Sequence, residues 1–149
     1  MYGKDHPRVA VNAIIMQKEK VLLTLRSDKV LFPRQWCPPG GHLIPGKSWV
    51  DTMMDEVKDE VGLQVVDYQF LGIYSDPSVN IIFDPASGEK IPFVSVAFLV
   101  TKFEGEVRIN DESLEAAWFG ERNLPSPIIP CDEVKVRDAF EFQGKCFVR

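Results

Sequence analysis

The chain lacks the patterns that mark secreted and membrane-spanning proteins. Its three cysteines (Cys37, Cys131 and Cys146) are an odd number without a C-x-x-C pair, which favours free thiols in a reducing compartment over a disulfide framework. No apolar run approaches the roughly 20 residues of a membrane span, and the N-terminus shows no secretory signal pattern. We therefore expect a cytoplasmic protein that does not act at a membrane.

Basic residues are sparse and scattered. The formal net charge is −5, and no more than two basic residues stand together, so nucleic acid is not an expected partner. An anionic substrate would need a local cation to offset repulsion. Repeats, low-complexity tracts and linker-like stretches are also missing, and the 149 residues are 45% apolar. We expect one ordinary globular domain over residues 1–149.

Apolar periodicity and turn residues predict a mixed α/β fold in which strands outnumber helices. Residues 9–16 and 21–26 are expected to form a hairpin, and the proline- and glycine-rich stretch 27–41 is expected to be a loop. Further along the chain the pattern predicts strands over 64–75, 80–83, 93–103 and 116–119, a turn over 84–89 and a closing helix over 132–142.

The clearest element is a helix over 48–61. Ser48, with Asp51 three residues later, fits a capping box that has Asp in place of the usual Glu. Gly62 stands where a left-handed glycine commonly ends a helix. Both ends of this helix are therefore predicted by residue type as well as by the apolar stripe between them.

This helix concentrates acidic side chains. At about 100° per residue, Glu56, Asp59 and Glu60 share one face beside the apolar stripe, where unpaired charge is costly. A hard cation such as Mg²⁺ would offset that charge. Taken alone, an acidic helix face is more often solvated surface. The preceding Gly40-Gly41, where a backbone can approach a ligand closely, favours a metal site.

Residues 41–63 resemble the signature of the Nudix hydrolases, G-x5-E-x7-R-E-U-x-E-E-x-G-U, where U is a bulky aliphatic residue. The spacing is kept without a gap. Trp36 and the glycines that follow it are similar to the family's W-x-x-P-G-G lead-in, and VLLTLRSD, YSDP and EAAWFGERNLP resemble other family segments. The resemblance implies a Nudix-type α/β/α sandwich with a mixed β-sheet. The matching signature positions are Gly41, Glu56, Val57, Glu60, Gly62 and Leu63.

Three signature positions depart from the family. Asp59 replaces a Glu, which keeps the charge but shortens the reach. Lys47 stands where the family has Glu, and Asp55 stands where it has Arg. In the family those two residues usually form an ion pair, so we interpret Lys47 and Asp55 as a charge-swapped pair that keeps the contact. The alternative is that both positions drifted after catalysis was lost.

The resemblance implies hydrolysis of a pyrophosphate bond in a nucleoside diphosphate derivative, with Mg²⁺ or Mn²⁺ as cofactor. The metal ligands that it implies are Glu56 and Glu60 first, Asp59 third, and the backbone carbonyl of Gly41. Mg²⁺ would offset the phosphate charge and lower the pKa of the attacking water.

The general base and the substrate-binding residues are less sharply indicated than the metal ligands. The general base is open between a carboxylate of the helix and two glutamates of a later loop. Arg26, Gly40 and Gly41 are the candidate substrate-binding residues. The candidate catalytic residues are Glu56, Glu60, Glu112 and Glu115.

The substrate expected is a small nucleotide. The YSDP segment favours a nucleoside diphosphate sugar such as ADP-ribose, with a nucleoside triphosphate next. The alternative from another class is a catalytically weakened or inactive Nudix-like nucleotide-binding module, which Lys47 and Asp55 would favour. A purely structural acidic domain explains neither the glycines nor the gap-free spacing. A homodimer is a further expectation, since dimers are common in the family.

Overall fold

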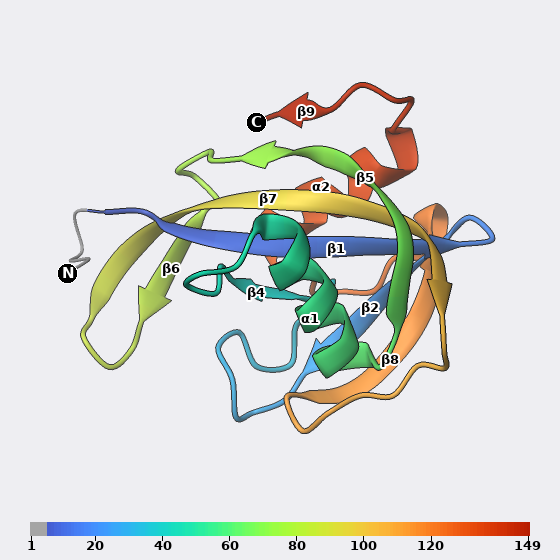
Figure 1. The fold of residues 1–149 in the computed structure, drawn as a ribbon. Coiled ribbons are helices and arrows are strands. Elements are labelled where there is room, and N and C mark those ends of the chain that lie inside the picture. The colour runs from blue at the N-terminus through green and yellow to red at the C-terminus, as the bar shows by residue number, and fades with distance from the viewer. Residues whose placement is uncertain (1–5) are drawn as a thin grey trace.

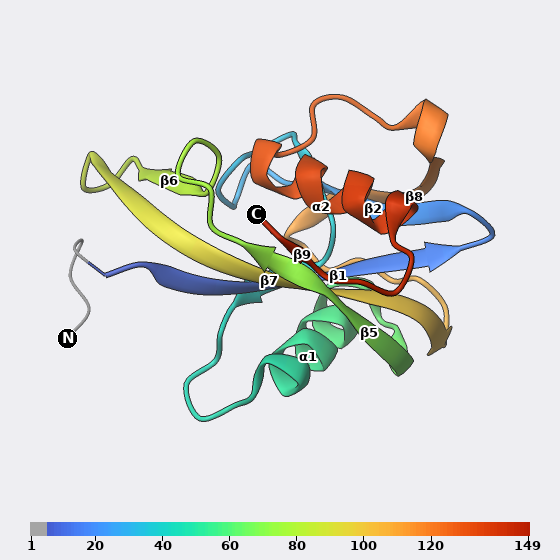
Figure 2. The same ribbon diagram turned by 90° about the horizontal axis from the view of Figure 1, so that it is seen from above.

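The computed structural model describes residues 6–149, which place a mixed β-sheet between two helices (Figures 1 and 2). The elements are β1 (Arg8–Gln17), β2 (Lys20–Arg26), β3 (Trp36–Cys37), β4 (Gly40–His42), α1 (Trp49–Val61), β5 (Gln64–Tyr74), β6 (Ile81–Asp84), β7 (Glu89–Glu104), β8 (Ser113–Gly120), a 3-10 turn at Glu121–Asn123, α2 (Pro130–Glu141) and β9 (Phe147–Val148).

The sheet runs in the order β3-β2-β1-β7-β5-β9, with β4 paired to β1, β6 to β7 and β8 to β2. The β1–β7 and β5–β9 pairs are parallel and the others are antiparallel. Figure 2 shows α1 on one face of the sheet and α2 on the other. This arrangement confirms the expected sandwich with a mixed sheet.

The central strand β1 serves both layers because successive side chains of a strand point to opposite faces. Val11, Ala13 and Ile15 belong to the buried cluster that packs against α1. Ile14 belongs to the cluster that packs against α2. Asn12, on the same face as Ile14, is the polar exception among the buried residues of this strand.

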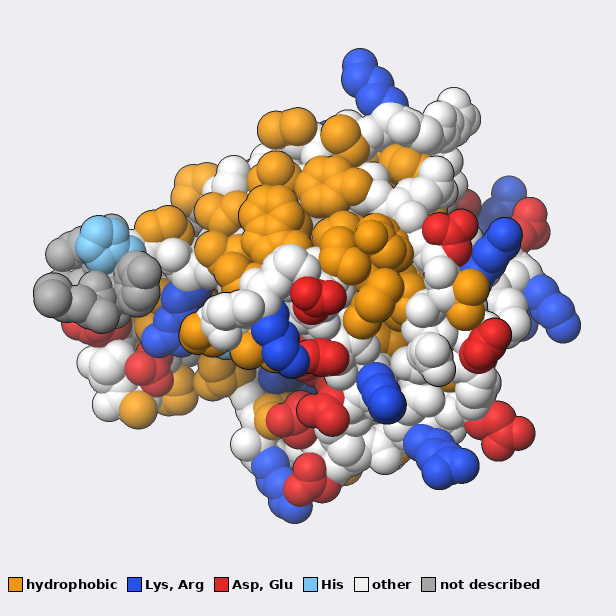
Figure 3. Space-filling model, viewed as in Figure 1, with side chains coloured by type: hydrophobic (Ala, Val, Ile, Leu, Met, Phe, Trp, Pro, Cys, Tyr) orange, Lys and Arg blue, Asp and Glu red, His pale blue; other side chains and the backbone are white. Residues whose placement is uncertain are grey.

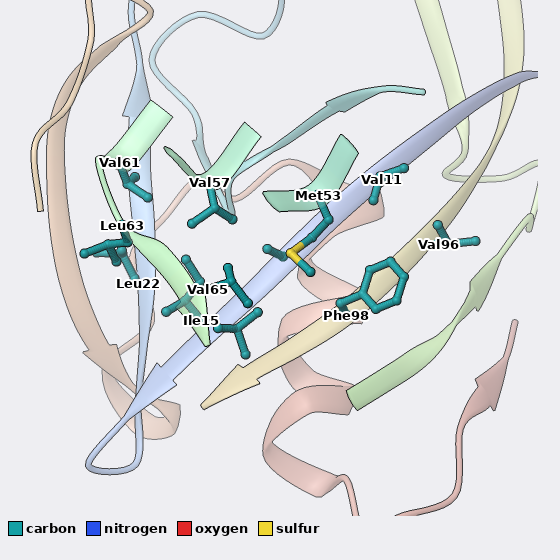
Figure 4. Packing of buried hydrophobic residues seen from close by; sticks show 12 residues of the cluster. Val11, Ile15, Leu22, Met53, Val57, Val61, Leu63, Val65, Val96 and Phe98 are labelled. Carbon is teal, nitrogen blue, oxygen red and sulfur yellow. The ribbon is translucent and has the colours of Figure 1, made fainter. Parts of the chain in front are cut away.

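Helix α1 forms as its sequence predicts. The Ser48 side chain accepts a hydrogen bond from the backbone of Asp51, and Gly62 closes the helix at φ 71°. Met53, Val57 and Val61 are buried against the sheet (Figure 4). Fully burying one such side chain is worth about 1.5–3 kcal/mol. On the outer face of the molecule, acidic side chains gather over α1 beneath a broader apolar area (Figure 3).

The prediction of an unbroken loop over 27–41 is wrong, because β3 and β4 lie within and at the end of it. Each has only two or three residues, and each exists by pairing with β2 or β1. Such short segments carry no periodic pattern of their own. The hairpin of β1 and β2 is confirmed, with Met16 opposite Val21.

Strand β7 begins earlier than 93–103 predicts and runs through Pro92. Pro92 pairs with Ile81 of β6, whereas the pairing with β1 begins only at Phe93. The proline therefore lies where β7 has a single neighbour and a missing N–H is tolerated. Neither β9 nor the 3-10 turn was expected. Among the helices of the described residues, none is long and apolar enough to cross a membrane.

Candidate functional site

A cavity of about 360 Å³ lies where β1, β2, β4 and the two helices meet. Gly40, Gly41, Glu56 and Glu60 line it together with Arg26 from the end of β2. The structure thus brings both predicted glycines, two of the three predicted helix carboxylates and the predicted arginine to one place.

The two glycines are required by close packing. A Cβ on Gly41 would stand 2.9 Å from the carboxyl carbon of Glu56. A Cβ on Gly40 would collide with the carbonyl oxygen of Val11 on β1. The Gly40 N–H also donates a hydrogen bond to Glu60 Oε2 at 3.3 Å. The missing side chains let the backbone of β4 lie directly against the carboxylates of α1.

Glu56 and Glu60 form a partly buried pair of like charge. Burial, reinforced by the neighbouring Glu56, raises the pKa of Glu60 to about 9. Burial also raises the pKa of Glu56, and the charges of Asp59 and Glu112 add to that effect. Within residues 6–149 neither carboxylate has a lysine or arginine at salt-bridge distance. Negative charge at this site is therefore not balanced by the side chains around it.

This donor set fits a hard divalent cation. Mg²⁺ takes oxygen ligands and is commonly held by one or two carboxylates, with waters and substrate phosphates completing its shell. The described residues contain no preassembled group of three or more His, Cys, Asp or Glu side chains with metal-site geometry. Glu56 and Glu60, with the Gly41 backbone beside them, line the cavity and are placed to serve as ligands.

The remaining predicted residues divide between the cavity and its surroundings. Glu112, in the loop before β8, lines the cavity. Asp59 is exposed and outside the lining, although its charge reaches Glu56. Glu115 is exposed on β8 opposite Leu25 and is also outside the lining. Of the two loop glutamates considered as general base, Glu112 is the one near the carboxylate pair.

Arg26 is held in place by the loop after β2. Its Nε donates to the carbonyl of Leu31, and Nη1 approaches Cys37 Sγ at 3.8 Å. These two contacts use only part of the five N–H donors of the guanidinium, and the residue lines the cavity. Arg26 is therefore positioned to donate to an anionic ligand.

The side of the cavity formed by α2 holds a polar cluster that sequence reasoning missed. Lys135 of α2 is 1% exposed and donates to Asn12 Oδ1 at 2.8 Å and to Asp132 Oδ1 at 3.0 Å. Phe32 and Phe93 supply apolar walls nearby. The available signal was Asn12, a lone amide in an otherwise apolar strand.

Lys47 and Asp55 form an ion pair between the loop before α1 and the helix itself. The hydrogen bond and charge of Asp55 raise the pKa of Lys47. The predicted charge-swapped contact is thus confirmed as a contact. Exposed pairs of this kind contribute little to stability, so this pair would matter chiefly by holding the loop against α1.

Comparison with known proteins agrees with the geometry. The family model described as NUDIX domain matches residues 6–138. An ADP-ribose pyrophosphatase of Methanocaldococcus jannaschii is 32% identical over 120 residues, which are 80% of this chain and 66% of that relative. The nucleoside triphosphatase NudI of Escherichia coli is 26% identical over 105 residues, which are 70% of this chain and 74% of NudI. Two other matched relatives are much longer, and the matched part spans 23% and 34% of their lengths.

Solved structures share the fold. A MutT NUDIX hydrolase from Burkholderia pseudomallei superposes with a TM-score of 0.75 at 24% identity, covering 89% of this chain and 98% of that one. An ADP-ribose pyrophosphatase from Streptococcus suis superposes with a TM-score of 0.68 at 23% identity, covering 97% and 98%. At these identities the likeness concerns the arrangement of strands and helices.

Proposed function

The chain belongs to the Nudix hydrolase family, and on that premise we propose that it is a pyrophosphohydrolase that cleaves a nucleoside diphosphate derivative with Mg²⁺ or Mn²⁺. The observation that carries the proposal is the unbalanced pair Glu56 and Glu60 beside Gly41. Buried like charges without a cation are costly to a fold, and their retention at a cavity indicates a ligand that offsets them.

Glu56, Glu60 and the Gly41 carbonyl would hold the ion. When bound, it would neutralise phosphate charge and lower the pKa of the attacking water. Arg26 would donate hydrogen bonds to phosphate oxygens from its fixed position. Glu112 would accept the proton of the attacking water, directly or through a second water. Glu115 and Asp59 would have supporting electrostatic roles, since neither lines the cavity.

The favoured substrate is ADP-ribose or a similar nucleoside diphosphate sugar, and a nucleoside triphosphate is the second candidate. Apolar walls at Phe32 and Phe93 and the polar end at Asn12, Asp132 and Lys135 suit a nucleobase, which has apolar faces and a polar edge. The names of the archaeal and streptococcal relatives support the first candidate, and that of NudI supports the second.

A substrate panel tests this function. Purified protein with Mg²⁺ or Mn²⁺ would be incubated with ADP-ribose, other nucleoside diphosphate sugars and nucleoside triphosphates, and the products would be separated by ion-exchange chromatography. We expect nucleoside monophosphate from ADP-ribose, no product after chelation, and none from Glu60→Gln. Wild-type protein that releases no nucleoside monophosphate or pyrophosphate from any panel member would refute the enzyme.

The alternative remains a nucleotide-binding module without turnover. Its specific support was the replacement of two signature residues by Lys47 and Asp55. The ion pair that they form keeps the loop tied to α1, which weakens that support. Nucleotide binding that survives Glu60→Gln unchanged, in a protein without turnover, would favour the module.

A further inference from the structure

A second and larger cavity, of about 790 Å³, adjoins the site just described. It is a groove between the start of β1, the loop that leads from β4 to α1, and the turn that joins β6 to β7. His42, at the end of β4, lines both cavities. The two spaces therefore meet at the residue that follows the glycines.

The strand β1 connects the polar end of the first cavity to the groove. Asn12, Ala10 and Arg8 alternate along β1 and so share one face. Asn12 lies opposite Gly40, and Ala10 lies opposite His42. Asn12 and Ala10 line the first cavity, and Arg8 lines the groove. At about 3.3 Å per residue, Asn12 and Arg8 are roughly 13 Å apart along the strand.

The chemistry of the groove is that of a sugar site more than a polyphosphate site. Val9, Ile44 and Ile91 give it apolar walls. Within the described part of the chain, the Arg8 guanidinium has no salt bridge or side-chain hydrogen bond. The carboxylate of Asp84, also on the wall, is occupied by its own turn.

The lining carries charges of both signs, with Asp84 and Glu89 beside Arg8 and Lys47. Among the described residues of the lining, the cations are thus matched in number by acids, so the groove has no excess of positive charge for a chain of phosphates. A ring with several hydroxyls can instead accept from Arg8 and lay its apolar face on Val9 or Ile44.

We propose that this groove binds the sugar moiety on the far side of the diphosphate, while the nucleoside occupies the cavity at Asn12 and the diphosphate lies between them at Gly41. The inference rests on the proposed function and adds its specificity: the groove selects nucleoside diphosphate sugars over nucleoside triphosphates. Arg8 is the specificity-determining residue, and it does not touch the reacting phosphorus.

Binding to an inactive protein separates this inference from turnover. Titration calorimetry with Mg²⁺ present would give the Kd of Glu60→Gln for ADP-ribose and for ADP. Adding Arg8→Ala should weaken ADP-ribose about tenfold, the effect of one charge-assisted hydrogen bond, and leave ADP within twofold. Adding Ser87→Trp, which fills the groove from the β6–β7 turn, should do the same.

Matched controls lie on the same segment. Lys90→Ala removes an exposed cation outside the groove lining. Ala86→Trp adds an indole ring next to Ser87 but outside the lining. Neither variant should change the Kd for ADP-ribose or for ADP. Equal losses for ADP and ADP-ribose, or no loss for ADP-ribose with either groove variant, would overturn the inference. A wild-type protein without turnover would refute the proposed function and leave this binding comparison intact.

Discussion

Two pairs of ionisable side chains line one cavity, one pair of opposite charge and one pair of like charge. At the α2 end, Lys135 pairs with Asp132 and donates to Asn12, so that charge and hydrogen bonds are satisfied inside the chain. At the α1 end, Glu56 and Glu60 bring two carboxyl groups of like charge together, and within residues 6–149 one backbone N–H, that of Gly40, donates a hydrogen bond to Glu60. The first pair is balanced within the folded chain, whereas the second would be balanced by the cation proposed for it.

The largest effect on activity is expected from neutralising one member of the like-charged pair. Glu60→Gln keeps the shape and removes the ligand charge, so kcat should fall about a thousandfold, or roughly 4 kcal/mol in the barrier. Steady-state release of nucleoside monophosphate measures it. Asp51→Asn, an exposed acid of the same helix, is the control and should stay near wild type. A Glu60→Gln protein within tenfold of wild type would exclude Glu60 as a ligand.

Breaking the pair of opposite charge should lower the stability of the fold. Lys135→Met leaves Asp132 buried without its partner, which should lower the free energy of unfolding by about 3 kcal/mol. Urea titration followed by tryptophan fluorescence measures this loss. Replacing both residues, as Lys135→Met with Asp132→Leu, should recover most of it. Lys58→Met on the exposed side of α1 should change stability by about 0.5 kcal/mol or less. A double variant no better than the single one would contradict the account.

The pH dependence of stability should come from the carboxylate pair. A carboxyl group whose pKa is raised in the folded protein keeps its proton after the unfolded chain has lost it. Without metal, the contribution of this pair to stability should therefore be complete below about 4.5 and be lost as pH rises toward about 9. Mg²⁺ should raise Tm at pH 8 by about 3 °C or more, and Glu60→Gln should flatten the pH profile. Calorimetric Tm values from pH 5 to 9 measure both effects; a Tm that rises with pH would contradict the assignment.

The smallest effect on stability is expected at the exposed Lys47–Asp55 pair. Lys47→Glu should change the free energy of unfolding little and lower kcat about tenfold, because a displaced loop misplaces the glycines. Asp55→Arg in the same protein restores opposite charges in the family's order and should recover the activity. A double variant as slow as Lys47→Glu would show that the pair does not position the loop.

The sequence predicts one end of this cavity far better than the other. The α1 end is local: Ser48, Gly62 and the acids stand in one continuous segment, so capping and helical periodicity fix their relation. Of the three acids placed on one helix face, Asp59 points outside the cavity lining. Helical spacing predicts which side chains share a face of the helix. It does not predict which of their carboxylates the neighbouring strand will enclose.

The α2 end depends on distant pairing. Lys135 is 123 residues from the Asn12 that it contacts, and the packing of α2 against β1 and β5 brings them together. The helix had loose apolar periodicity because Asp132, Lys135 and Asp138 are buried among its apolar residues. Because buried lysines are uncommon, residue type alone predicts that Lys135 is exposed to solvent.

The alternation of β1 restricts how this strand can vary among related proteins. Side chains can be exchanged one for one, since each stays on its own face. A deletion or insertion of a single residue would turn Asn12 toward the apolar layer under α1 and an isoleucine or valine toward Lys135. We therefore expect β1 to accept substitutions but not insertions or deletions, so that distant members of the family should align along this strand without a gap.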